Sequence, residues 1–210
     1  MIRGIAVFDL DGTLLRGDTV CELLAKPLSR LAQMRQFETL TQEAEIADAR
    51  TQMARWYEGH SQESLQNYLK EAEWAPGALQ AVRELQQGNV LVAIASITWK
   101  FAVQWFADQL SVRHYLGTDI KEDGVIAHVW PRDKARWLLD LVRHYGVSRS
   151  QVAAIGDSWG DAEMLSVAKL SFFVGNTPLP GLSSAMHLPN ADLRTVSQSI
   201  LEAWPALPNS

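Results

Sequence analysis

Near its start the chain reads Ile5-Ala6-Val7-Phe8-Asp9-Leu10-Asp11-Gly12-Thr13. The apolar run predicts a buried strand, which ends at two aspartates separated by one residue. Residues two apart in a strand point to the same side, so the carboxylates of Asp9 and Asp11 are expected to lie close together. Two close carboxylates repel unless a cation lies between them or one holds a proton. The stretch therefore predicts a divalent-metal site for phosphoryl transfer, although the same five residues, 9–13, also make a good turn.

Beyond this stretch, short apolar runs alternate with amphipathic helical segments. Further strands are predicted over residues 90–95, 152–155 and 171–174, and helices over 78–87, 99–110, 134–145, 161–168 and 193–203. Residues 118–128 favour a hairpin with its turn at Glu122-Asp123-Gly124. Such alternation is typical of a parallel sheet covered by helices on both faces. We therefore expect an α/β fold with a doubly wound, Rossmann-like and mainly parallel sheet.

The segment between the first two strands is too long for a simple crossover connection. It predicts a helix that starts near Asp18 and breaks at Pro27, a second over 41–57, and a third capped by Ser61. We interpret residues 15–75 as an inserted all-helical cap, and residues 1–14 and 76–210 as the α/β core. Open α/β sheets bind ligands at the carboxyl ends of their strands, so the cap is expected above Asp9 and Asp11.

Composition limits the classes of function. The 210 residues carry a net charge of −5, with 47% hydrophobic and 20% charged residues, which is typical of a soluble globular protein. The negative charge gives no support for a nucleic-acid partner, and no apolar run approaches the ~20 residues that span a membrane. The first strand leaves no room for a signal peptide, so we expect a cytoplasmic location. We expect a monomer or a homodimer.

Polar residues at the predicted strand and helix ends form a candidate site, whose members are Asp9, Asp11, Ser96, Lys134, Asp157 and Asp161. A serine hydroxyl can donate to a phosphate, and a lysine can neutralise charge on the group in transfer. Asp9 and Asp157, on neighbouring strand ends, can hold a hard cation such as Mg²⁺. Taken singly, the serine can be a helix cap, the lysine a surface charge, Asp157 part of a turn and Asp161 an N-cap. Their joint order favours the site.

In these residues the chain resembles phosphatases of the haloacid dehalogenase superfamily, in particular the phosphoserine-phosphatase-like branch with its helical cap after the first motif. The segment Asp9-Leu10-Asp11-Gly12-Thr13 matches the first motif, Ser96 the second, Lys134 the third, and Gly156-Asp157-Ser158-Trp159-Gly160-Asp161 the acidic fourth. The match covers essentially the whole core. It implies a phosphoric monoester hydrolase that cleaves a small phosphorylated metabolite with Mg²⁺ through an aspartyl-phosphate intermediate.

The resemblance also implies residue roles. Asp9 is the nucleophile, and Asp11 protonates the leaving alcohol and then takes a proton from the hydrolytic water. Mg²⁺ binds the Asp9 carboxylate, the Asp11 backbone carbonyl and Asp157, while Asp161, with Ser158 beside it, orients Lys134 or a metal-bound water. The phosphoryl oxygens are bound by Thr13, Ser96, Ile97 and Lys134. Dehalogenases of the superfamily lack an acid at the position of Asp11, so this residue favours phosphate ester chemistry.

Several positions depart from phosphoserine phosphatases. Ile97-Thr98-Trp99 follow Ser96 where those enzymes carry glycines, and Asp18 stands where they carry a glutamate that reads the substrate amine. Arg50 and Arg55 are candidates for their cap arginine. Trp99 and Trp159 are candidate pocket walls, with core packing as the alternative. The departures leave the substrate open, and two other functions share the site: a phosphotransferase or mutase, and a non-catalytic protein that binds a phosphorylated metabolite.

Overall fold

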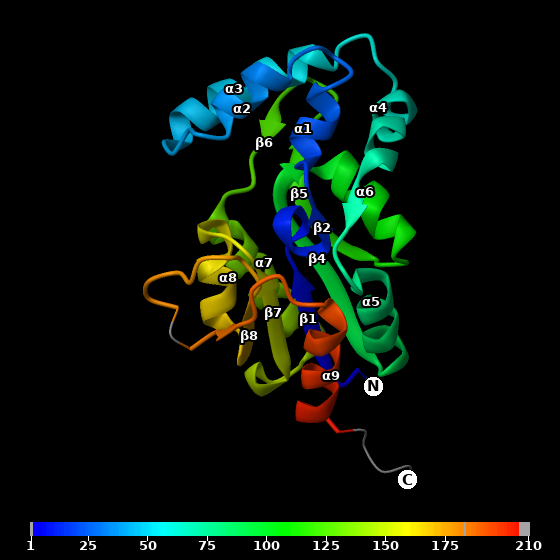
Figure 1. Ribbon diagram of the computed structural model, residues 1–210, viewed down its shortest axis with the longest axis vertical. Helices are drawn as coiled ribbons and strands as arrows, with labels where there is room; N and C mark the ends of the chain where they lie inside the picture. The colour runs from blue at the N-terminus through cyan, green and yellow to red at the C-terminus, as the bar shows by residue number, and fades with distance from the viewer. Residues whose placement is uncertain (1, 183, 206–210) are drawn as a thin grey trace.

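A seven-stranded sheet forms the centre of the protein in the computed structural model, which describes residues 2–182 and 184–205. Residues 1, 183 and 206–210 of the predicted core lie outside this range. The strand order is β6-β5-β4-β1-β7-β8-β9, with only β5–β6 antiparallel among the described pairs (Figure 1). The strands are β1 (Gly4–Phe8), β4 (Val90–Trp99), β5 (His114–Ile120), β6 (Ile126–Ala127), β7 (Val152–Gly156), β8 (Leu170–Phe173) and β9 (Met186–His187). The predicted doubly wound, mainly parallel sheet is confirmed.

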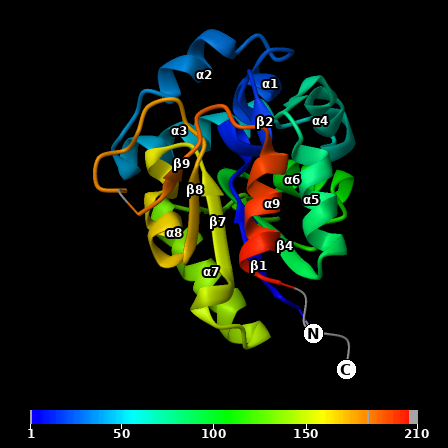
Figure 2. The same cartoon turned by 60° about the horizontal axis from the view of Figure 1, so that its bottom comes forward.

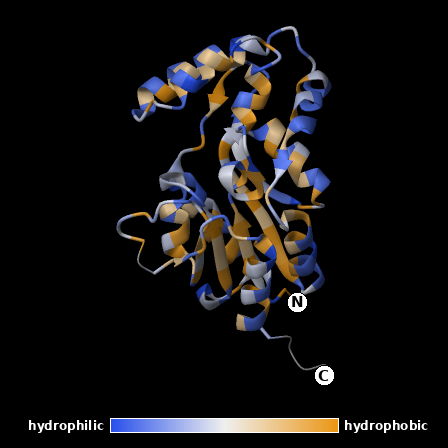
Figure 3. Cartoon of the chain, in the orientation of Figure 1, coloured by the Kyte–Doolittle hydropathy of each residue, from blue (hydrophilic) through white to orange (hydrophobic). Residues whose placement is uncertain are grey.

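Helices cover both faces of this sheet, as Figures 1 and 2 show. Because side chains alternate along a strand, Ala6 and Phe8 of β1 pack in one core cluster while Ile5 and Val7 pack in the other. The first cluster takes in α5 (Ala78–Gln87), α6 (Lys100–Gln109) and α9 (Leu193–Ala203), and the second α7 (Pro131–Tyr145) and α8 (Ala162–Val167). The central strands are hydrophobic along their length, as buried parallel strands are (Figure 3). None of the helices in the described ranges combines the length and the apolarity that a membrane crossing needs.

Within the segment between β1 and β4, residues 17–71 lie above the carboxyl ends of the strands (Figure 1). The segment contains α1 (Val20–Ala25), α2 (Leu31–Phe37), α3 (Glu43–Trp56) and α4 (Gln62–Tyr68), followed by the short turn η2 (Leu69–Glu71). Thr19 caps α1 and Ser61 caps α4 through side-chain hydrogen bonds, and α1 ends two residues before Pro27. An antiparallel ribbon of β2 (Leu15–Arg16) and β3 (Glu73–Trp74), which the sequence analysis did not predict, joins the two ends of the segment. The boundaries at residues 15 and 75 stay a prediction.

Two elements differ from the prediction where the site is built. Strand β4 continues past Ser96 to Trp99, and its register with β5 shifts between Ala95 and Trp99. Ser96 therefore lies in an irregular part of the strand rather than after its end. Helix α7 begins at Pro131, three residues before the predicted start, because a proline suits the first helical position and the Asp133 carboxylate accepts a hydrogen bond from the backbone of Trp130 (2.9 Å). Lys134 consequently lies inside the first turns of the helix.

Candidate active site

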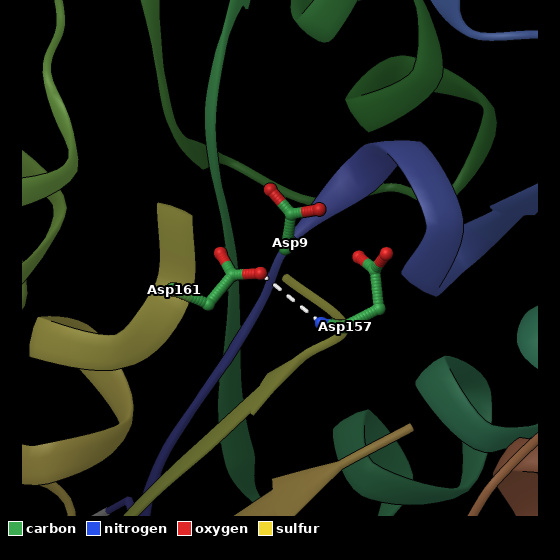
Figure 4. Close-up of side chains that lie close together, drawn as sticks. All are labelled: Asp9, Asp157 and Asp161. Carbon is green, nitrogen blue, oxygen red and sulfur yellow. Dashed lines mark hydrogen bonds between the residues drawn. The ribbon is translucent and has the colours of Figure 1, made fainter. Parts of the chain in front are cut away.

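Three aspartates converge at the carboxyl end of the sheet. Strands β1 and β7 are parallel neighbours with Phe8 opposite Ile155, so Asp9 and Asp157 leave the sheet at the same edge. The backbone N–H of Asp9 donates to the carbonyl of Ile155 at 2.9 Å. One carboxylate oxygen each from Asp9, Asp157 and Asp161 lies within 4.8 Å of the other two, and Figure 4 shows the three side chains close together.

Lys134 ties two of these acids together. Its ammonium Nζ lies 2.6 Å from Asp9 Oδ1 and 2.7 Å from Asp161 Oδ1, and the side chain is only 2% exposed. The second oxygen of Asp161 accepts hydrogen bonds from the backbone N–H groups of Asp157 and Ser158 and from the Ser158 hydroxyl. Both oxygens of Asp161 are thus engaged. Asp161 holds Lys134 on one side and the 157–158 turn on the other.

The remaining carboxylate oxygens suit a cation. Thr13 donates its hydroxyl to Asp157 Oδ1 at 3.0 Å, whereas Asp9 Oδ2 and Asp157 Oδ2 accept no hydrogen bond from residues in the described ranges. Hard cations such as Mg²⁺ prefer carboxylate oxygens, and three acids around one ammonium leave a surplus of negative charge. The donor set of Asp9 and Asp157 therefore fits a divalent metal.

The carboxylate of Asp11 is not part of the close cluster of Asp9, Asp157 and Asp161. Its Oδ1 accepts a hydrogen bond from the backbone N–H of Val20 at 2.8 Å, at the first residue of α1. The cap therefore contributes directly to the position of this side chain. Burial raises the pKa of Asp11 to about 7, in the range where a carboxyl group can both give and take a proton at neutral pH.

The pKa values of Asp157, Asp9 and Lys134 reflect the crowding of three carboxylates around one ammonium. Burial, followed by the charge of Asp161, raises the pKa of Asp157 to about 6. Burial and the carboxylates of Asp161 and Asp157 raise the pKa of Asp9 well above its usual range, against the opposing effect of Lys134. Burial alone lowers the pKa of Lys134, but Asp161 and Asp9 outweigh it and raise that pKa above its usual value. The ammonium is therefore charged at every physiological pH.

Gly12 allows the first motif to pass beside Asp157. Its φ is +78°, and a Cβ on this residue would lie 2.2 Å from Asp157 Oδ2. The turn η1 (Leu10–Leu14) therefore needs glycine both for its left-handed backbone and for the space that the carboxylate takes.

Replacing Gly12 with alanine should lower both stability and metal affinity. The left-handed backbone costs about 1–2 kcal/mol with a side chain, and displacement of the Asp157 carboxylate should weaken Mg²⁺ binding about tenfold or more. Urea unfolding and Mg²⁺ titration measure the two effects. Gly124→Ala is the matched control, because Gly124 has a φ of +80° but no atom within 4 Å of the added Cβ. Equal Mg²⁺ affinity in both variants would contradict the close approach to Asp157.

A cavity of about 490 Å³ opens between these residues and the cap. Its floor contains Asp9, Asp11, Ser96, Lys134 and Asp157, with Ile97, Trp99, Ser158 and Gly160 beside them. The Ser96 side chain is buried, and its Oγ accepts a hydrogen bond from the backbone N–H of Thr98 at 3.2 Å. The structure thus brings the predicted nucleophile, acid, serine, lysine and metal ligands to one cavity.

The other candidates from the sequence are divided between this cavity and the rest of the surface. Asp18 forms an ion pair with Lys26 and lines a separate hollow beside the β2–β3 ribbon. Arg55 lies on an exposed part of α3 that faces another groove. Trp159 is 61% exposed and does not line the cavity, whereas Trp99 is buried in its wall. The Thr13 hydroxyl is directed to Asp157, where it positions a carboxylate.

Arg50 connects the cap to the core. It projects from α3 with 5% exposure, and its Nη2 donates to the carbonyls of Ile97 (3.0 Å) and Val129 (3.2 Å). Its Nη1 lies 3.2 Å from His128 Nδ1, and its guanidinium carbon lies 4.8 Å from the ring centre of Trp130. Arg50 therefore holds α3 against the segment that follows Ser96 and the segment that precedes α7.

The Arg50→Met variant should be destabilised by about 2–3 kcal/mol, because buried carbonyls lose charged donors. Chemical denaturation measures the difference. Arg55→Met, a change of the same kind on an exposed face of the same helix, should stay within about 0.5 kcal/mol of the parent protein. A similar effect of both substitutions would show that the Arg50 contacts contribute nothing to the docking of the cap.

The sequence analysis did not single out several residues that line the site. Gly12 belongs to the first motif, and its position directly after Asp11 could have indicated a close backbone approach. Residues Ile46, Ala49 and Met53 line the cavity from one face of α3, and their spacing of three, then four, was visible in the sequence. Glu38, at the rim, carries no local signal because only the docking of α2 places it there.

A doubly wound sheet with a cluster of aspartates at its strand ends beneath a helical insertion defines a capped α/β protein with an acidic site. A family model described as haloacid dehalogenase-like hydrolase matches residues 6–166, so the chain belongs to that family, and the resemblance found in the motifs is confirmed.

Curated relatives point to the phosphoserine-phosphatase-like branch. The phosphoserine phosphatase of Archaeoglobus fulgidus is 24% identical over 213 residues, which cover 89% of this chain and 61% of that protein. Phosphoserine phosphatase SerB2 of Mycobacterium tuberculosis is 25% identical over 188 residues, which cover 84% and 45%. The chain thus spans 45–61% of the length of these relatives. A solved structure, a phospho-aspartyl intermediate analogue of phosphoserine phosphatase, has the same fold, with a TM-score of 0.76 at 18% identity over 95% of this chain and 99% of that one.

Proposed function

We propose that this protein is a Mg²⁺-dependent phosphatase that hydrolyses a small phosphate monoester through a phosphorylated Asp9. The observation that carries the proposal is the buried network of Asp9, Lys134 and Asp161. Together with Asp157, Asp9 and Lys134 line a cavity of about 490 Å³. The size of the cavity suits a small phosphorylated metabolite. The phosphoserine phosphatases among the relatives support the same reaction class.

In the proposed reaction, an oxygen of Asp9 attacks phosphorus and forms the aspartyl-phosphate while the bond to the alcohol oxygen breaks. Asp11 gives its proton to the departing alkoxide, which leaves as the alcohol. Water then attacks phosphorus, Asp11 takes its proton, and inorganic phosphate leaves as the Asp9 carboxylate is restored. Throughout, Lys134 neutralises charge on Asp9 and the phosphoryl oxygens.

Ser96 and the metal complete the proposed site. The buried Ser96 hydroxyl at the floor of the cavity is free to turn and donate to a phosphoryl oxygen. Asp9 and Asp157, with the Asp11 carbonyl, would hold Mg²⁺, which when bound supplies positive charge to the phosphoryl group. Asp161 is a positioning residue that does not contact the substrate itself. One of its oxygens binds Lys134, and the other binds the 157–158 turn.

Removal of the metal tests this proposal. Phosphate release from p-nitrophenyl phosphate should stop in EDTA and return when Mg²⁺ is added in excess. Independently of activity, Mg²⁺ at a hundredfold excess over its Kd should stabilise the protein by about 2.7 kcal/mol. The Asp157→Asn variant should lose that stabilisation, whereas Asp108→Asn, on an exposed part of α6, should keep it. Full activity in EDTA would contradict the metal-dependent mechanism.

The two alternatives make different predictions. A phosphotransferase or mutase should convert the ester to a new phosphorylated alcohol, with little free phosphate. A binding protein should bind phosphate esters without turnover of any ester in a broad panel. The combination of a nucleophile, Asp9, and an acid–base group, Asp11, in one cavity favours catalysis over binding, since a receptor needs neither group.

A further inference from the structure

The upper wall of the cavity is apolar. Helix α3 presents Ile46, Ala49 and Met53 on one face, and α2 adds Met34 and Phe37. Leu40, between the two helices, extends this surface. Residues spaced by three and four lie on one side of a helix, so the wall is a continuous surface rather than scattered side chains. This wall lies across the cavity from the acids at the floor. With the phosphate bound at the floor, the rest of a substrate would lie against the wall.

The cap contributes two charged residues to the lining of the cavity among the residues that the structure describes, Glu38 and Arg50. Arg50 Nη2 has two hydrogens, and the carbonyls of Ile97 and Val129 take them. Glu38 lies at the rim and accepts a hydrogen bond from the Thr19 hydroxyl at 2.7 Å. The cap thus offers a leaving group one acidic side chain and one arginine whose Nη2 donors are already engaged.

This lining suits an amino-acid ester poorly. A phosphorylated amino acid brings an ammonium and a carboxylate, and each needs a partner when it leaves water. Asp18, the predicted partner of the ammonium, is paired with Lys26 outside the cavity. Glu38 at the rim is then the one acid that the cap offers to the ammonium, and the carboxylate finds no free cation among the described cap residues that line the cavity, because Arg50 Nη2 is committed to backbone carbonyls. An alkyl or aromatic group has no such requirement, and it gains free energy by burial against the apolar wall.

We propose that the cavity selects phosphate monoesters of apolar alcohols, with an alkyl or aryl leaving group, over esters of charged amino acids such as phosphoserine. This inference rests on the proposed phosphatase function and names its substrate class. Ile46 and Met53 are the specificity-determining residues, since they are the two large side chains that line the cavity from the apolar face of α3, on either side of Ala49.

The test is a series of n-alkyl phosphates from methyl to hexyl, with phenyl phosphate and O-phosphoserine, assayed with Mg²⁺ for phosphate release. We expect kcat/KM to rise about three- to fourfold per added methylene until the wall is covered. We expect phenyl and hexyl phosphate to exceed O-phosphoserine by tenfold or more. Ile46→Gln should flatten the increase with chain length. Thr51→Gln is the matched control, because Thr51 is exposed on the same helix and lines no part of the cavity.

The outcomes separate this inference from the function on which it rests. Phosphate release that is independent of chain length, or that is faster for O-phosphoserine, overturns the substrate class and leaves the phosphatase function standing. An unchanged slope in Ile46→Gln overturns the role of the α3 face. Absence of release from every ester overturns the proposed function, and calorimetric titration of hexyl phosphate and O-phosphoserine into the Mg²⁺-loaded protein then decides the preference. Equal or weaker binding of hexyl phosphate would overturn the inference as well.

Discussion

The Asp9→Asn variant should lose at least three orders of magnitude in kcat for p-nitrophenyl phosphate, with a folded structure retained. A carboxamide is a poor nucleophile, and loss of a covalent catalyst typically has an effect of this size or larger. The change is nearly isosteric and removes one of three carboxylates that crowd a single ammonium, so we expect little loss of stability. Steady-state kinetics and circular dichroism measure the two properties.

Asp108→Asn is the control, since it makes the same chemical change at an exposed position of α6. It should retain the activity of the parent protein. A rapid quench with a labelled ester should trap phosphoprotein in the parent and none in Asp9→Asn. Retention of most of the activity by Asp9→Asn would refute the assignment of the nucleophile, whatever the substrate.

The Lys134→Met variant should lose both activity and about 3–5 kcal/mol of stability, the usual result when one partner of a buried ion pair is removed. In the parent, Asp9 and Asp161 share the ammonium at 2.6 and 2.7 Å. Without the ammonium, the buried carboxylates of Asp9 and Asp161 face each other. Their repulsion favours protonation of one of the two in the folded state. Because the folded state then binds more protons than the unfolded state, the deficit should grow as the pH rises from 5 to 8. Urea denaturation at several pH values measures this dependence.

Lys121→Met provides the comparison for Lys134→Met. Lys121 also pairs with an aspartate, Asp119, but its side chain is 51% exposed, and surface pairs of this kind contribute about 0–1 kcal/mol. If Lys134→Met does not fold, the double variant with Asp161→Asn should restore part of the stability, since it removes one of the unpaired charges. A Lys134→Met protein as stable as Lys121→Met, at all pH values, would show that the buried network does not hold the site together.

Much of the core could be predicted because local signals define its elements. Helices α5 and α9 have the predicted bounds, 78–87 and 193–203, and the break before α2 follows from Pro27. Apolar runs identified β1 and β7, and the acid directly after each predicted the shared edge where Asp9 and Asp157 meet. The family motifs assigned Lys134 and Asp161 to the same site, and the structure brings them together.

Periodicity, caps and the residues at strand ends depend on neighbouring positions in the sequence, so the chain alone predicted the central strands β1, β4, β7 and β8, the helices that cover them and the acids at the carboxyl edge, but not the edge strand β9. The partners of individual side chains depend on contacts across long separations, such as 125 residues between Lys134 and Asp9 and 47 between Arg50 and Ile97. Packing of the cap on the core engaged Arg50 with backbone carbonyls and placed Glu38 at the rim. No local pattern encodes these outcomes, because each is set by the relative position of elements that fold far apart in the chain.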